Sequence, residues 1–234
     1  NFVDQLPFDF RSTHGGNTTC VEVRCDDALF ILDMGSGLHE LGNALMPDVF
    51  KTKKLHGHIL QSHVHWDHIQ GVPSWPQLYL PRRLFDTYFT FFGGKSWDAQ
   101  LELVLAGQMN PPMFPVSFAE LRQTAMRMEF QTVYDGWCVE LPGESGTIRI
   151  FARKLNHPQE TFGYRIEYAG CTLAFTTDHE PYASGIPRGF YDLVKDADVW
   201  ITDCQYAHET YTASRGGVQR MGWGHSYPEY IAAV

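Results

Sequence analysis

The apolar and polar positions of the chain predict many short strands, with helices between and after them. Residues 18–24 alternate apolar and polar side chains, as a half-buried strand does, and residues 28–32 form a short apolar run typical of a buried strand. Ser36 can cap a helix that we expect to run to about Met46 and to end at Pro47. Further strands are predicted at 58–60, 77–80, 128–134, 147–155, 161–168, 171–176 and 199–202, and a short helix at 190–195.

The middle of the chain has the least regular pattern. It contains an aromatic run at 88–92, the pair Gly93-Gly94, and helical patterns at about 96–107 and 117–127. The aromatic residues at 88–97 can form a lid hinged at the glycine pair, a dimer contact or part of the core. Two groups of strands with helices between them favour α/β layers over an all-α or all-β fold.

We expect residues 1–234 to form one α/β domain, in which residues 82–127 are an irregular, aromatic-rich insert. Near the end of the chain, Ser226 is a favourable helix N-cap and Pro228 suits the first helical turn. The chain stops at Val234, and a helix of roughly two turns is rarely stable alone. We therefore expect the natural protein to continue, and this domain to lack its C-terminal end.

A cluster of metal-binding residue types follows the strand predicted at 58–60. The segment 61–68 reads Gln-Ser-His-Val-His-Trp-Asp-His and contains the pattern His-x-His-x-Asp-His. Alternate residues of an extended chain point to the same side, so the first two histidines can bind one metal ion, and the aspartate and last histidine can turn towards a second. Imidazole suits zinc and similar metals, and carboxylate is a harder donor. The alternative is a solvated loop that is merely rich in histidine.

Two later residues, His157 and Asp178, can complete such a site. Each comes just after a predicted strand, His157 in Leu-Asn-His-Pro and Asp178 in Thr-Thr-Asp-His. Alone, either would be read as an ordinary polar residue. Together with the first motif they become candidate ligands, and an aspartate between two metal ions is a natural bridge.

The order of these motifs resembles the metallo-β-lactamase superfamily. Residues 155–167, in which a histidine is followed by Gly-Tyr and a strand, are similar to the corresponding part of ribonuclease Z and of the bacterial phosphoribosyl cyclic phosphodiesterases. Residues 198–203 and 224–226 resemble segments of ribonuclease Z, and residues 32–38 resemble an early segment of the same branch. The resemblance covers nearly the whole chain and implies an α/β fold built as a four-layer αβ/βα sandwich.

The resemblance also implies a role for each candidate residue. It implies ligands for two divalent metal ions: His63, His65 and His157 for the first, Asp67 and His68 for the second, and Asp178 bridging them. It implies three catalytic residues: Asp67, Asp203 and His225. A metal-bridged hydroxide would attack phosphorus, and a protonated His225, oriented by Asp203, would donate to the departing alkoxide. The alternative for His225 is a histidine that merely caps a helix.

The metal site leaves three questions open. Zinc is the first choice of metal, with manganese and iron as alternatives. The superfamily branch usually supplies one more histidine near the C-terminus, and nothing after His225 can serve. Either the chain is cut short, which we favour, or His225 takes that place, or the second site is weak. By sequence position, His14 and His179 are the best candidates to support the ligands.

Charge restricts the substrate. The chain has 18 Lys and Arg against 27 Asp and Glu, a net charge of −9, and its best basic clusters are residues 51–54 and 82–83. A long nucleic acid is therefore not expected, and we find no basic, Gly/Pro-rich arm such as ribonuclease Z carries. A small anionic substrate held by the metal ions fits better.

The sequence also bears on the cellular compartment and the oligomeric state of the protein. The chain shows no signal peptide and no apolar run long enough for a membrane, and its five cysteines suit reduced positions in the core. We therefore expect a cytoplasmic protein without membrane contact. A homodimer is expected only by analogy with the superfamily branch.

The function expected from these observations is that of a dinuclear-metal hydrolase, a phosphodiesterase that cleaves a small or cyclic phosphodiester. The alternatives are a hydrolase of a carboxylic ester, lactone or thioester on the same metal core, or a non-catalytic relative. A β-lactamase is disfavoured because it lacks a bridging aspartate such as Asp178. An oxygen-reducing diiron protein is disfavoured because it would have glutamate in place of His65.

Overall fold

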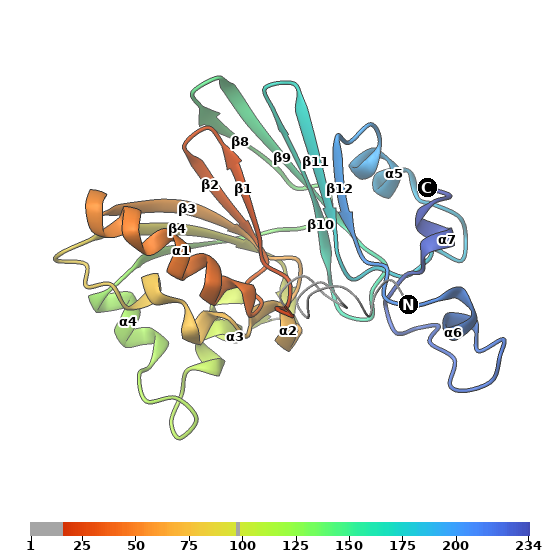
Figure 1. Cartoon of the computed structure of the whole chain (residues 1–234), viewed down its shortest axis with the longest axis horizontal. Helices are drawn as coiled ribbons and strands as arrows, with labels where there is room; N and C mark the ends of the chain where they lie inside the picture. Colours follow the sequence, from red (N-terminus) through yellow and green to blue (C-terminus); the bar gives the residue numbers. More distant parts are fainter. Residues whose placement is uncertain (1–15, 97–98) are drawn as a thin grey trace, which may run out of the picture.

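Two five-stranded sheets lie face to face in the computed structural model, which describes residues 16–96 and 99–234 (Figure 1). The first sheet has the order β1-β2-β3-β4-β7, with the bounds Val21–Cys25, Ala28–Leu32, Lys54–Leu60, Asp86–Gly93 and Arg127–Thr132. The second has the order β12-β11-β10-β9-β8, with the bounds Val199–Thr202, Cys171–Thr176, Phe162–Tyr168, Gly146–Lys154 and Cys138–Gly143. The short strands β5 (Lys95–Ser96) and β6 (Ala99–Gln100) pair with each other.

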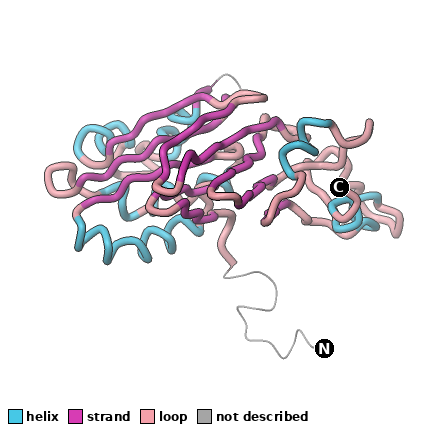
Figure 2. Tube along the Cα trace, turned by 90° about the horizontal axis from the view of Figure 1, so that it is seen from above, coloured by secondary structure: helices cyan, strands magenta, loops and turns pink. Residues whose placement is uncertain are grey.

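Helices lie at the periphery of the two sheets (Figure 2). The first sheet is covered by α1 (Gly37–Thr52), α3 (Leu101–Gln108) and α4 (Phe118–Thr124), and the second by α5 (Arg188–Val194). Shorter elements lie in the connections: α2 (Trp66–Ile69), η3 (Val72–Ser74), η4 (Pro76–Tyr79), α6 (His208–Thr212) and α7 (Pro228–Ile231). The layers run helix, sheet, sheet, helix, so the expected α/β sandwich is confirmed.

Strand β4 explains the aromatic run. Phe89 and Phe91 are buried against the helices of the first sheet, whereas Phe92 is buried in the core between the two sheets. This alternation is that of a strand covered on both faces. A Cβ on Gly94 would lie 2.4 Å from the Phe162 ring, and one on Gly93 would lie 2.8 Å from Leu101, so the glycine pair serves close packing. For residues 88–94 the expectation of a lid, a hinge or a dimer contact is therefore wrong, and Trp97 lies outside the described residues.

Helix α1 continues through Pro47 instead of ending there. Its buried positions, which include Leu38, Leu45 and Val49, extend beyond the proline. Burial of this apolar face outweighs the one backbone hydrogen bond that the proline removes. Tertiary packing, which the local pattern does not contain, sets the end of this helix.

Three further expectations differ from the structure. Residues 77–80 do not form a strand: most of them belong to η4, where the Gln77 side chain donates to the Gly42 carbonyl of α1 at 2.7 Å. Strand β8 was not predicted. The five cysteines are free, but Cys138, Cys171 and Cys204 are exposed, so only part of the set is buried as expected. The other predicted strands, and the helices near 96–107, 117–127 and 190–195, correspond to elements of the structure.

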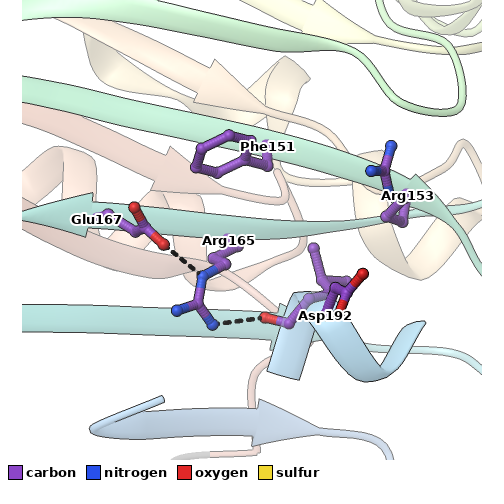
Figure 3. A pocket seen from close by; sticks show the side chains of 6 residues that line it. Phe151, Arg153, Arg165, Glu167 and Asp192 are labelled. Carbon is purple, nitrogen blue, oxygen red and sulfur yellow. Dashed lines mark hydrogen bonds and ion pairs between the residues drawn. The ribbon is translucent and has the colours of Figure 1, made fainter. Parts of the chain in front are cut away.

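Arg165 fixes α5 to the outer face of the second sheet (Figure 3). Its guanidinium donates to Glu167 at 2.8 Å and to the Leu193 carbonyl of α5 at 3.1 Å. A pocket of about 260 Å³ lies beside these contacts. It is lined by Arg165, Glu167 and Leu193 together with Phe151, Arg153 and Asp192. The pocket lies outside the sandwich and contains none of the predicted metal ligands.

No helix within the described ranges combines the length and apolar character that a membrane span requires.

His58 on β3 lies in the core between the sheets. Its ring stacks on Phe30 with a centroid distance of 5.1 Å, and its Nδ1 is buried with no hydrogen-bond partner among the described residues. Burial lowers the pKa of this imidazole. Below about pH 6.5 the unfolded chain binds a proton here that the folded chain does not, so stability is lost as the pH falls.

We expect His58→Phe to reduce the acid sensitivity of folding, because phenylalanine does not titrate and can keep the stacking on Phe30. The measurement is urea unfolding of both proteins at about pH 7.5 and about pH 5. The loss of unfolding free energy between the two pH values should be smaller in the variant. An equal loss in both proteins would contradict the role of His58.

Candidate metal centre

The candidate residues follow the carboxyl ends of strands from both sheets, at one edge of the sandwich near α2 (Figure 1). β2, β3 and β4 are parallel neighbours, as are β11 and β12, and β9 runs in the direction of β11 because both are antiparallel to β10. Five side chains or segments therefore meet here: Asp33 after β2, residues 61–68 after β3, His157 after β9, Asp178 after β11 and Asp203 after β12.

Four of the predicted ligands form a compact cluster. Ligand atoms of His63, His65, His157 and Asp178 all lie within 4.8 Å of one another. His65 Nδ1 is 2.9 Å from His63 Nε2 and 3.2 Å from His157 Nε2, and Asp178 Oδ2 is 3.6 Å from His63 Nε2. The structure thus brings together the three histidines assigned to one metal ion and the aspartate assigned as the bridge.

The donor atoms of this cluster fit a divalent metal ion. His157 Nδ1 donates to the Gly224 carbonyl at 3.0 Å, and His63 Nδ1 lies 3.0 Å from the Ser62 hydroxyl. These bonds hold the protons on the outer ring nitrogens, so the inner Nε2 atoms carry lone pairs. Burial and the neighbouring His68 lower the pKa of His63 to about 2, and burial lowers that of His157. Lone pairs this close repel one another unless a cation lies between them.

His68 and Asp67 lie on the other side of Asp178. His68 Nε2 is 3.3 Å from Asp178 Oδ2 and 3.5 Å from Asp67 Oδ2. Burial disfavours a charge on His68, but Asp33 and Asp178 outweigh it and raise the pKa to about 10. A position that favours a bound proton so strongly also favours a metal cation. The side chains predicted for a second ion are therefore adjacent, with Asp178 between the two groups.

A buried carboxylate, Asp33, holds the histidine segment in place. It is fully buried and accepts four hydrogen bonds. The donors are Ser62 N at 2.7 Å, Ser62 Oγ at 2.8 Å, His68 Nδ1 at 2.7 Å and Gln61 Nε2 at 3.1 Å. Asp33 therefore directs His68 Nε2 to the site. Because the Ser62 hydroxyl donates to Asp33, its oxygen can accept from His63 Nδ1, and the same carboxylate also orients His63.

Gln61 links the two ends of the segment 63–68 by hydrogen bonds. Its side-chain amide donates to the carbonyls of His63 at 2.6 Å and of His68 at 3.1 Å, in addition to Asp33. His63 and His68 are buried, whereas His65 and Asp67 are exposed. The cluster is therefore rigid on its inner side and open to solvent on its outer side, where a substrate can enter.

His225 lies beside the cluster and is held by Asp203. His225 Nδ1 donates to Asp203 Oδ2 at 3.0 Å, and its Nε2 lies 4.0 Å from Asp178 Oδ2. Burial lowers the pKa of His225, but the hydrogen bond to Asp203 and the charge of Asp178 raise it by more. The structure thus forms the expected pair and places the free nitrogen of His225 towards the cluster.

Ser226 does not cap a helix, contrary to expectation. The N-cap of α7 is Tyr227, and the Ser226 hydroxyl instead donates to the carbonyl of His179 at 2.5 Å, while its N–H donates to Asp203 at 3.0 Å. His179 is fully buried behind the cluster, where burial lowers its pKa to about 4. Its carbonyl holds Ser226, and thereby supports the loop that carries His225. His14 lies outside the described residues.

Three supporting residues were missed by sequence reasoning: Asp33, Gln61 and Glu180. An acidic residue directly after a predicted buried strand was a usable signal for Asp33, because the other strand ends of this edge carry predicted ligands. Glu180 follows Asp178 and His179 directly, but its side-chain carboxylate contacts residues more than 30 positions away along the chain. Nothing local marks it.

We expect Asp33→Asn to weaken metal binding by about 10- to 100-fold, the usual cost of removing a group that orients metal ligands. All four groups that contact Asp33 donate, so the amide NH2 of asparagine must face a donor. The measurement is zinc affinity by competition with a chromophoric chelator, with far-ultraviolet circular dichroism as the control for folding. Unchanged affinity in a folded variant would refute the orienting role.

Several proteins of known structure share the fold of this chain. The metallo-β-lactamase fold protein YhfI from Bacillus subtilis shares 17% identity over 90% of this chain and 70% of its own, with a TM-score of 0.56. Human tRNase Z, short form, shares 17% over 92% and 80%, with a TM-score of 0.60. A diphosphatase from the PhnP family shares 19% identity over 92% of this chain and 67% of its own, with a TM-score of 0.58. These likenesses concern the fold.

A search of curated proteins finds no match. The profile of the family described as "Beta-lactamase superfamily domain" matches residues 38–234, which include the His-x-His-x-Asp-His segment, His157, Asp178 and His225. Members of this superfamily are mostly metal-dependent hydrolases. The chain belongs to the β-lactamase superfamily domain family.

Proposed function

We propose that this protein is a dinuclear-metal phosphodiesterase that hydrolyses a small or cyclic phosphodiester. The observation that carries the proposal is the placement of His225, whose Nε2 lies 4.0 Å from Asp178 while Asp203 holds its other nitrogen. Cleavage of a phosphodiester releases an alkoxide, which needs a proton. A histidine with a raised pKa beside the metal cluster suits that need.

The ligands in this proposal are those that meet at the site. His63, His65 and His157 would hold one ion, and Asp67 and His68 the other, with Asp178 between them. Such ions, zinc first and manganese or iron as alternatives, would activate water and neutralise charge on the phosphoryl oxygens. The exposed carboxylate of Asp67 can accept a proton from a substrate-side water, and His225 would protonate the leaving group.

The substrate in this proposal is a small anion. The net charge of −9 disfavours a long polyanion, so attraction must come from the metal ions at the site. Two proteins of the same fold are a tRNase and a diphosphatase by name, which is in keeping with phosphate chemistry. The open side of the cluster, at His65 and Asp67, gives the substrate access.

The direct test combines metal content with turnover of bis(p-nitrophenyl) phosphate, with zinc or manganese added. We expect two metal ions per chain and metal-dependent turnover. His63→Ala should lose both together, because His63 is buried at the centre of the cluster. His208→Ala, which removes an exposed histidine, is the matched control and should keep both.

Two outcomes would count against the proposal. Metal binding with turnover of carboxylic ester or lactone substrates, but not of phosphodiesters, would assign the protein to the alternative hydrolase class. A His63→Ala variant with full metal content would overturn the metal assignment itself.

We expect His225→Ala to keep both metal ions and to lose turnover mainly on substrates with poor leaving groups. A general acid contributes about 10²- to 10⁴-fold, and an activated aryl leaving group needs little of this help. The measurement is kcat on an alkyl and on a p-nitrophenyl phosphodiester. An equal loss on both substrates would argue against proton donation by His225.

A further inference from the structure

We propose that Glu180 is a positioning residue that clasps the segment 203–226 and thereby sets the orientation of both His157 and His225. The inference rests on the proposed function where it concerns turnover, and on the metal cluster alone where it concerns His157. Glu180 lies on the β11 side of the site, two residues after Asp178, and is 8% exposed.

The segment 203–226, between β12 and α7, has few anchors of its own. Its only regular element is the short helix α6, and its buried residues are Tyr211, Gly224 and Ser226. The rest is exposed or half-buried, including Trp223 directly before Gly224. A segment with so little buried surface is held in one conformation by a small number of polar contacts.

Glu180 supplies three of these contacts. Its Oε1 accepts from the Tyr211 hydroxyl at 2.7 Å and from Gly222 N at 2.6 Å, and its Oε2 accepts from Gly224 N at 3.2 Å. All three partners are donors, and two of them are backbone N–H groups that cannot change role. Only a side chain with two acceptor oxygens satisfies them.

Gly224 connects Glu180 to His157, because it contacts both residues through its backbone. The Gly224 carbonyl accepts from His157 Nδ1 at 3.0 Å, which fixes the ring so that its Nε2 faces the other ligands. The approach is so close that a Cβ on Gly224 would lie 2.1 Å from His157 Nδ1, and the residue has a φ of +87°. A shift of Gly224 therefore displaces a predicted metal ligand directly.

The same stretch of backbone carries His225. On its far side, Asp203 accepts from His225 Nδ1 and from Ser226 N, both at 3.0 Å. His225 is thus held between two carboxylates, with Glu180 acting through Gly224 and Asp203 acting directly. Release of the Glu180 side would free the backbone that precedes the imidazole.

A purely structural role for Glu180 makes a different prediction. Tyr211→Phe removes one hydrogen bond from the clasp but leaves the Gly222 and Gly224 contacts to Glu180. Glu180→Gln keeps the size of the side chain and turns an NH2 group towards a backbone N–H. If Glu180 serves stability alone, both variants lower the melting temperature and neither alters the site.

The test uses the cobalt(II)-loaded protein, whose visible absorption spectrum reports ligand geometry, together with kcat on alkyl and p-nitrophenyl phosphodiesters. We expect Glu180→Gln to alter the cobalt spectrum and to lower kcat by about tenfold or more, with the larger loss on the alkyl substrate. Tyr211→Phe should keep the wild-type spectrum and most of its kcat. Glu229→Gln, on the exposed surface of α7, is the control for loss of a carboxylate.

Each outcome decides the proposal. A wild-type cobalt spectrum in Glu180→Gln, or equal changes in Glu180→Gln and Tyr211→Phe, would overturn it. If Glu180→Gln does not accumulate as folded protein, Glu180→Asp keeps both oxygens but withdraws them by one methylene, and it should show the same contrast with Tyr211→Phe. Absence of phosphodiester turnover in the wild type would refute the proposed function. The cobalt spectra would still show whether Glu180 positions His157.

Discussion

The site depends on one buried carboxylate more than on any other group. Asp33 accepts hydrogen bonds from the backbone and hydroxyl of Ser62, from His68 and from Gln61. Its own backbone is left-handed, with a φ of 61°. A buried charge without partners is unfavourable, so these donors must converge on it whenever the chain is folded. Their convergence is what points two imidazoles outward. The hydrogen bonds that stabilise this buried anion therefore also orient His63 and His68, two of the predicted metal ligands.

The second sheet repeats this arrangement with a different carboxylate. Glu180 gathers donors from Tyr211, Gly222 and Gly224, as Asp33 gathers them from the histidine segment. Each half of the sandwich therefore has a buried acid behind its ligands. His63 and His68 are set by the first, whereas His157 is set through the second. The two buried carboxylates thus orient the cluster from its protein side, which leaves its solvent-exposed side open to a substrate.

The clustering of these side chains was predictable from the sequence because each predicted ligand belongs to a local pattern. Residues 63–68 form one motif, and His157 and Asp178 each follow a strand whose apolar residues are visible in the sequence. The supporting contacts were not predictable, because Asp33 lies 29 and 35 residues from Ser62 and His68. The same limit applies to the fold: the end of α1 beyond Pro47 and the tie of Gln77 to Gly42 are set by packing between elements. Ser226 was misread because its hydroxyl bonds His179, 47 residues away.

The predicted ligands are divided between the two sheets, which links the site to folding. His63, His65 and His68 follow a strand of the first sheet, whereas His157 and Asp178 follow strands of the second. Neither sheet alone can assemble the cluster, so it forms only after the two sheets dock across their shared core. An ion bound there would stabilise the docked state over the separated one, by about 2.7 kcal/mol at a concentration about 100 times the dissociation constant. A cation bound there would therefore hold the two halves of the sandwich together, and the equilibrium stability of the fold would rise with the concentration of metal ion.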